Sequence, residues 1–144
     1  MKKNISIIAM SFLLLMINTI IGQDIKKDNL SQRVKEHTID VNFSKVLIEN
    51  SSSDTSFVIL DVRTPQEFNE GHIPGAININ YLSENFANAI KKLDKGKTYL
   101  IYCRSGRRSA KALAVFLESG FENVYNMQGG FIQWSQQFSN EGKK

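Results

Sequence analysis

The chain has 144 residues, of which 42% are hydrophobic and 22% are charged, and this composition fits one globular core and argues against disorder. The formal net charge at pH 7 is +4, and two of the positive charges, Lys2 and Lys3, belong to the first 22 residues. The charge that remains is too small to indicate a nucleic-acid binder, so we expect no nucleic-acid partner.

Residues 1–22 have the pattern of a secretory signal peptide, in which Lys2 and Lys3 precede an uncharged, largely apolar run. The run covers residues 5–21 and is interrupted by polar residues, and it falls short of the roughly 20 apolar residues that a spanning helix prefers. We expect cleavage after Gly22 and export to the periplasm. The alternative is an uncleaved segment that anchors the domain in the membrane, facing away from the cytoplasm.

Residues 23–37 are polar and charged, and we predict a linker here with one helical turn. From residue 38 to about residue 140, strand and helix patterns alternate, which predicts one domain over residues 38–140. Residues 57–62 form a continuous apolar run that is typical of a strand buried on both faces of a parallel sheet. The predicted strands are residues 38–41, 57–62, 75–79, 98–102 and 123–127.

Helices are predicted between these strands. Phe43 and Val46 stand at helical spacing in the first of them, and Ser83 is expected to cap the third. The predicted helices are residues 42–50, 65–71, 83–93, 107–119 and 131–138. Because strands alternate with helices, the fold class is α/β, with a parallel sheet covered by helices on both faces.

Cys103 is the only cysteine in the chain, so the domain has no internal disulfide, and this thiol is either an inert buried residue or a reactive one. It directly follows the strand 98–102, and the carboxyl ends of parallel strands form the ligand-binding edge of a sheet. An ordinary thiol has a pKa near 8.5 and is only about 3% thiolate at pH 7. A helix N-terminus and nearby cations lower that pKa, so this position favours a reactive thiolate.

The residues after Cys103 supply the groups that would stabilise a thiolate. The N–H groups that begin the following helix have no partner within that helix and can point at an anion. Ser105 and Gly106 let the chain curl tightly, since glycine tolerates a positive φ. The cations expected to raise the local potential are Arg104, Arg107 and Arg108.

Asp61 and Arg63 come at the end of the predicted strand 57–62 and therefore lie on the same edge of the sheet. For Asp61 we favour a structural role. Two interpretations of Arg63 stay open, because it either adds positive potential for an anionic substrate or forms an ion pair with Glu67, one helical turn later.

The chain contains two histidines. We expect His72 to pack in a turn and hydrogen-bond to the backbone rather than to act as a general base, and His37 has no evident partner. Two histidines and one cysteine are too few soft ligands for a zinc site, so no metal is expected.

Four segments resemble motifs of the rhodanese family, the sulfurtransferases. The segment "CRSGRRS" (residues 103–109) resembles the active-site loop of that family. The segments "VILDVRTPQEF" (58–68) and "EGHIPGAINI" (70–79) resemble its two signatures, and "GFENVYNMQGGFIQW" (120–134) resembles its C-terminal strand and helix. The motifs follow one another in the order of the family, and the resemblance spans residues 38–138.

This resemblance implies a three-layer α/β/α domain with a central parallel sheet of about five strands. It implies a reaction in which the Cys103 thiolate takes the outer sulfur from a small anionic donor such as thiosulfate and holds it as a persulfide. An external thiol or cyanide then accepts the sulfur, since the chain has no second cysteine. No cofactor is implied, and we expect a monomer.

Two other functions remain open at this stage. Cysteine phosphatases and arsenate reductases also use a loop that begins with Cys and ends with Arg, but five residues separate the two there, whereas four separate Cys103 from Arg108. A persulfide carrier or a redox module that binds a protein partner is the second alternative.

Overall fold

The computed structural model describes residues 7–138, and the chain divides into two compact units, Met1–Arg33 and Val34–Lys144. Lys2 and Lys3 of the predicted signal peptide, and residues 139–140 at the predicted end of the domain, lie outside the described residues. Within residues 7–138, no helix combines the length and the apolar character that a membrane span requires.

Helix α1 (Ile7–Glu36) accounts for the described part of the first unit. It continues through residues 23–36, so the prediction of a linker with a single helical turn there was wrong. The physical reason is local, because residues 23–36 contain no glycine or proline and are rich in Lys, Gln, Glu, Leu and Arg, which favour helix.

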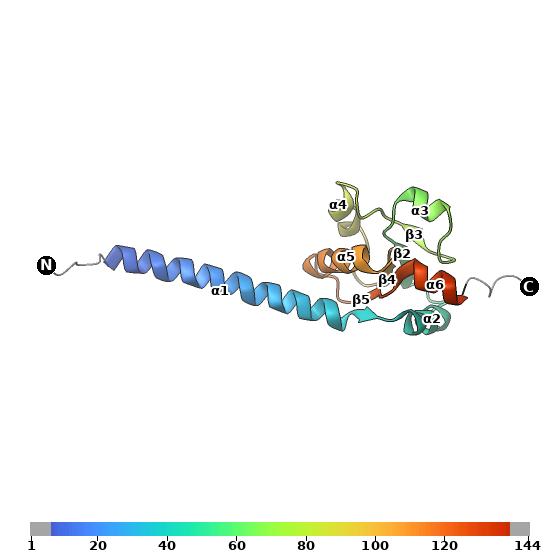
Figure 1. Ribbon diagram of the computed structural model, residues 1–144, viewed down its shortest axis with the longest axis horizontal. Helices are drawn as coiled ribbons and strands as arrows, with labels where there is room; N and C mark the ends of the chain where they lie inside the picture. The colour runs from blue at the N-terminus through green and yellow to red at the C-terminus, as the bar shows by residue number, and fades with distance from the viewer. Residues whose placement is uncertain (1–6, 139–144) are drawn as a thin grey trace, which may run out of the picture. The chain divides into compact units, whose positions relative to one another are not determined.

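The second unit contains a five-stranded sheet in the order β1-β5-β4-β2-β3, and all four strand pairings are parallel. The strands are β1 (Thr38–Ile39), β2 (Phe57–Asp61), β3 (Ile77–Asn78), β4 (Thr98–Tyr102) and β5 (Val124–Met127). The predicted parallel α/β sheet is therefore confirmed, with β4 at its centre (Figure 1).

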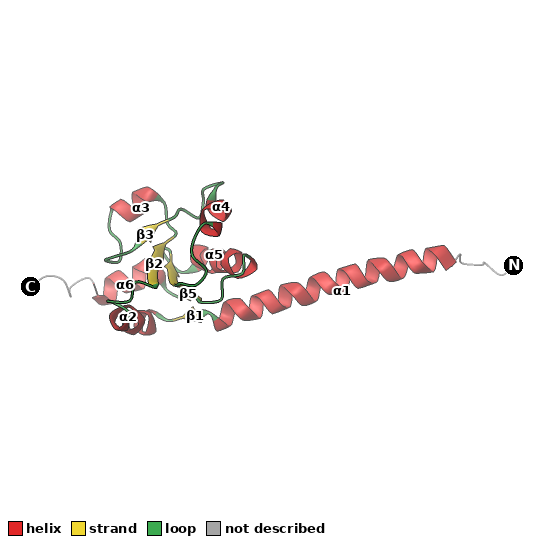
Figure 2. Cartoon of the chain, turned by 180° about the vertical axis from the view of Figure 1, so that it is seen from behind, coloured by secondary structure: helices red, strands yellow, loops and turns green. Residues whose placement is uncertain are grey.

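Helices cover both faces of this sheet. They are α2 (Val41–Asn50), α3 (Pro65–Asn69), α4 (Phe86–Lys91), α5 (Arg107–Glu118) and α6 (Gly130–Phe138). Helices α2, α3 and α6 lie on one side of the strands and α4 and α5 on the other (Figure 2), which gives the three layers that the sequence predicted.

The two faces have separate apolar cores because side chains alternate along each strand. Leu100 and Tyr102 of β4 pack with Trp134 of α6 in one core. On the opposite face, Tyr99 packs against Phe116 of α5, with ring centroids 5.8 Å apart. Both cores hold β4 rigidly, and the residue that follows β4 is Cys103.

Some predicted details differ from the structure. Strand β1 stops at Ile39 because the Asp40 carboxylate accepts the Phe43 N–H at 2.8 Å and caps α2. Phe43 and Val46 of that helix are 56% and 50% exposed, so they are not core residues. Ser83 does not cap α4, because its hydroxyl accepts the N–H of Asn85, which lies before the helix.

Candidate active site

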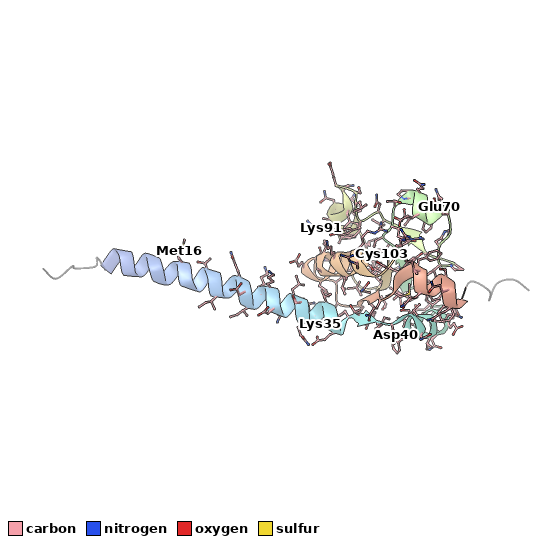
Figure 3. The ribbon with its side chains drawn as sticks, in the orientation of Figure 1. Met16, Lys35, Asp40, Glu70, Lys91 and Cys103 are labelled. Carbon is pink, nitrogen blue, oxygen red and sulfur yellow. The ribbon has the colours of Figure 1, made fainter. Side chains whose placement is uncertain are left out.

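Cys103 lies at the carboxyl end of the central strand β4 (Figure 3), and its residue is 1% exposed. Its sulfur accepts the backbone N–H of Gly106, with a nitrogen–sulfur distance of 3.2 Å. The Ser109 hydroxyl oxygen lies 3.4 Å from the same sulfur and is itself fully buried. The thiol therefore sits at the floor of a loop that turns donors toward it.

Gly106 gives this loop its shape. It is the N-cap residue of α5 and has a φ of +91°, a conformation that other residues adopt at a cost. A Cβ atom at this position would lie 3.1 Å from the backbone nitrogen of Gly129, so a side chain there would require the neighbouring backbone to shift. Both the φ and the packing of this position therefore favour the glycine that the sequence predicted.

The first turn of α6 holds the other side of the loop. The N–H of Phe131 donates to the carbonyl oxygen of Cys103 at 2.8 Å, and the N–H of Ile132 donates to that of Arg104 at 3.0 Å. Gly130 permits this approach, since a Cβ atom there would collide with the Cys103 carbonyl and lie 2.7 Å from the carbonyl carbon of Arg104. These bonds engage the carbonyls of the loop and leave its N–H groups for the sulfur.

Two opposing effects act on the thiol. Burial by itself raises the pKa of Cys103, since it penalises the thiolate. Hydrogen bonds from the hydroxyl and the N–H of Ser109, and from the N–H groups of Ser105 and Gly106, outweigh burial and lower the pKa of Cys103 below its usual value. The loop therefore favours the nucleophilic form of the sulfur.

The three predicted arginines have different positions. Arg104 and Arg107 are exposed at the rim of the loop. Arg108 is only partly exposed, and its guanidinium donates to both carboxylate oxygens of Glu67 at 2.8 and 2.6 Å. This pair ties the start of α5 to α3, and the Arg108 hydrogen bonds lower the pKa of Glu67 to about 2.

Asp61 and Arg63 form a buried ion pair on the same edge of the sheet. The Arg63 guanidinium donates to the Asp61 carboxylate at 2.6 to 3.0 Å and to the carbonyl oxygen of Gly71 at 2.6 Å. Arg63 also lies over the ring of Phe131, 4.3 Å from its centroid. The ion pair proposed between Arg63 and Glu67 was therefore wrong, because each residue has a different partner.

The prediction for one histidine is confirmed and the prediction for the other is not. The prediction for His72 is confirmed, since its Nδ1 lies 2.9 Å from the carbonyl oxygen of Phe68 and its ring stacks on that phenyl ring. His37 does have a partner, because its Nδ1 lies 2.9 Å from the carbonyl oxygen of Val124. Among residues 7–138, no group of three or more His, Cys, Asp or Glu side chains could hold a metal ion.

Sequence reasoning missed Ser109 and Glu67 as parts of the site. Ser109 stands six positions after Cys103, and its place on the inward face of α5 could have been read from the helical spacing of the buried residues around it. Glu67 forms a capping box with Thr64, and the spacing of these two residues is a recognisable helix-start signal. Its second role, in binding Arg108, has no local signal.

A cleft of about 390 Å³ opens beside the loop and is lined by Arg104, Ser105, Arg107 and Arg108, together with residues of neighbouring segments. A buried cysteine in a loop at the carboxyl edge of a parallel sheet defines a class of α/β domains. The chain belongs within this class to the family of the rhodanese-like domain, whose model matches residues 44–137.

Relatives with known names support the same family. "Thiosulfate sulfurtransferase GlpE" of Shewanella oneidensis is 38% identical over 81 residues, which cover 56% of this chain and 78% of that protein. "Probable adenylyltransferase/sulfurtransferase MoeZ" of Mycobacterium tuberculosis is 34% identical over 110 residues, which cover 76% of this chain but only 27% of that longer protein.

A solved structure agrees with the fold. The solution structure of the rhodanese-like domain of the Anabaena sp. Alr3790 protein superposes with a TM-score of 0.59 at 27% sequence identity, covering 69% of this chain and 74% of that one. The resemblance noted from four sequence motifs is thereby confirmed at the level of the family and the fold.

Proposed function

We propose that the protein is a sulfurtransferase that moves a sulfane sulfur from a small anionic donor such as thiosulfate, through a persulfide on Cys103, to an external thiol or cyanide. The observation that carries this proposal is the set of donors on the Cys103 sulfur, from Gly106 at 3.2 Å and Ser109 at 3.4 Å. The names of the sulfurtransferase relatives support the same reaction class.

In the first step, the Cys103 thiolate attacks the outer sulfur of thiosulfate. The sulfur–sulfur bond of the donor breaks, sulfite leaves with the electron pair, and Cys103 holds a persulfide anion. The exposed Arg104 and Arg107 side chains line the cleft through which an anion would approach, so their charge favours encounter with the donor.

In the second step, the acceptor attacks the outer sulfur of the persulfide. Cyanide attacks the persulfide anion, whereas a thiolate attacks the persulfide after that sulfur has taken up a proton. The bond between the two sulfurs breaks, and the Cys103 sulfur leaves as a thiolate with the electron pair. The N–H and hydroxyl donors that lower the pKa of Cys103 also stabilise this leaving thiolate, so one loop serves both steps.

The geometry gives less support to phosphate or arsenate chemistry. Such enzymes need an arginine that faces the oxygens of the substrate, but Arg108, which ends the loop, binds Glu67 through both of its terminal nitrogens. They also need an acid for the leaving group. The described groups that hydrogen-bond to the Cys103 sulfur are the N–H of Gly106 and the hydroxyl of Ser109, and neither is such an acid, so we expect negligible hydrolysis of an aryl phosphate.

We also propose that the domain is exported, on the evidence of Lys2, Lys3 and the apolar run over residues 5–21. Sequencing of the N-terminus of protein isolated from its host tests this proposal. A start near Gln23 is expected, whereas an intact Met1 in protein from the cytoplasm would show that the segment is not an export signal.

Intact-mass analysis after treatment with thiosulfate tests the reaction. The wild-type protein should gain the mass of one sulfur atom and lose it again when cyanide is added, with release of thiocyanate. Cys103→Ser should remain folded, since the change is small, and should gain no mass. Sulfur transfer by Cys103→Ser, or the absence of any adduct on wild type, would contradict the proposed mechanism.

A further inference from the structure

The cleft beside the loop is larger than a small sulfur donor requires. Its volume is about 390 Å³, within the range of pockets that bind drug-sized ligands. Two of its lining segments lie outside the loop, namely Tyr81 and Leu82 before α4, and Lys111 on the first turns of α5. Neither segment is needed to hold a small anion against Cys103, so these residues are available to contact a larger ligand.

The cleft is strongly cationic. Arg104, Arg107 and Lys111 are exposed, and within residues 7–138 none of the three forms a salt bridge with a carboxylate. Lys111 stands four residues after Arg107 on α5, so the two side chains project from one side of the helix. Three unpaired cations on one cleft favour a ligand with several negative charges.

Leu82 adds an apolar contact at the same place. Leu82 is 62% exposed, and its backbone N–H donates to the side-chain oxygen of Asn80 at 3.0 Å. The neighbouring Tyr81 N–H donates to the carbonyl of Val62, and the Tyr81 ring packs on Phe86. Leu82 is therefore held on a fixed segment, where it can contact an apolar side chain of a bound polypeptide.

The other side of the loop is less cationic. A second cleft of about 380 Å³ lies there, and its lining includes Arg63, Glu67, Glu70 and Arg104. Arg63 is bound to Asp61 and Glu67 is bound to Arg108, which leaves the opposite charges of Glu70 and Arg104 on that side. An acidic ligand is thus favoured more on the α5 side, where Arg107 and Lys111 add their charges to that of Arg104.

We propose that the cleft formed by Leu82, Arg104, Arg107 and Lys111 docks the sulfur acceptor, and that this acceptor is a polypeptide whose thiol is flanked by carboxylates. The proposal rests on the proposed function, because Cys103 is the only cysteine and its persulfide needs an outside thiol. The acceptor thiolate attacks the outer sulfur of the protonated persulfide, the bond between the two sulfurs breaks, and Cys103 leaves as a thiolate. The acceptor keeps the sulfur and the proton as its own persulfide, so no oxidant is required.

The test uses the purified full chain loaded with sulfur from thiosulfate, with loading measured by intact mass. Two synthetic peptides of equal length serve as acceptors, one with Asp and Glu around its single cysteine and one with Asn and Gln in their place. At low ionic strength, transfer to the acidic peptide should be roughly tenfold faster, and added salt should remove the difference.

Lys111→Glu should reduce the preference for the acidic peptide, measured as the ratio of the transfer rates to the two peptides from protein loaded to the same extent. Leu82→Asn should slow transfer to both peptides alike, because its apolar contact does not depend on their charge. Lys91→Glu is the matched control, because it makes the same change of charge at an exposed lysine on α4 that does not line the cleft. Lys111→Glu should slow discharge of the persulfide by cyanide less than it slows transfer to the acidic peptide, because cyanide carries a single charge and makes no docking contact.

The outcomes separate this inference from the proposed function. Wild-type protein that takes up sulfur but delivers it equally to both peptides would overturn the inference alone. The same holds if Lys91→Glu loses the preference as fully as Lys111→Glu does. Protein that takes up no sulfur would overturn the proposed function and the inference together.

Discussion

Removal of the Ser109 hydroxyl should raise the pKa of Cys103, because this group is the first of the donors that offset burial of the thiol. A hydrogen bond to a charged group contributes about 1.5 to 3 kcal/mol. The distance of 3.4 Å between the Ser109 oxygen and the Cys103 sulfur is long, and the hydroxyl also lies 3.1 Å from the Gly106 carbonyl oxygen. The contribution of this hydrogen bond is therefore taken at the lower end of that energy range. Ser109→Ala should therefore raise the pKa of Cys103 and reduce the thiolate population at a pH below that pKa about tenfold, since about 1.4 kcal/mol is a factor of ten in an equilibrium constant.

The rate of alkylation by iodoacetamide as a function of pH measures this pKa directly, because only the thiolate reacts. Ser105→Ala is the matched control. Ser105 is exposed and acts on the sulfur through its backbone N–H, which the substitution keeps. An unchanged alkylation profile in Ser109→Ala, or an equal shift in both variants, would refute the assignment of the hydroxyl as a thiolate donor.

Two further predictions concern stability. The pKa of Glu67 is about 2 in the folded protein against an ordinary 4.5, so its pair with Arg108 stabilises the fold above pH 4.5 and the contribution is lost as the pH falls toward 2. Allowing for solvent screening, Glu67→Gln should cost about 1 kcal/mol at neutral pH, and urea unfolding of both proteins should converge in acid; a constant difference across this range would contradict the pairing. Gly130→Ala should cost about 2 kcal/mol or more, because its φ of +59° is strained for alanine and the new Cβ meets the carbonyls of Cys103 and Arg104. Gly75 has a φ of +81° and open space around it, so the smaller loss of stability expected for Gly75→Ala measures the cost of φ alone. Equal losses of stability for Gly75→Ala and Gly130→Ala in urea unfolding would show that the collision at Gly130 is relieved.

The order of the elements could be predicted because their signals are local. Continuous apolar runs identified β2 and β4, helical spacing identified α5, and alternation of the two identified a parallel sheet. Where the prediction was wrong, a local detail competed with the pattern. Asp40 ended β1 early by capping α2, and Ser83 formed a turn before α4 instead of its cap.

The position of Cys103 at the carboxyl end of a buried strand also followed from the sequence, but the central place of that strand and the partners of Cys103 did not. The ion pair between Glu67 and Arg108 joins residues 41 positions apart, whereas the sequence suggested the nearer Arg63. The bonds from the first turn of α6 to the loop carbonyls depend on how two elements pack. Such contacts are tertiary, and the spacing of residues along the chain does not predict them.

These partners separate the activation of the thiol from the binding of its substrates. The hydrogen-bond donors that lower the pKa of Cys103 are backbone N–H groups and the buried Ser109 hydroxyl, all of which are neutral. The charge of Arg108 also interacts with the Cys103 thiolate, but Arg108 is held by Glu67. If the exposed Arg104 and Arg107 set this pKa instead, an anionic donor that bound them would cancel their charge and raise the pKa at the moment of attack. Neutral donors on a rigid loop keep their effect whatever occupies the cleft. In the proposed reaction, the same thiolate is the nucleophile toward the donor anion and the leaving group toward the acceptor, while the exposed arginines attract both.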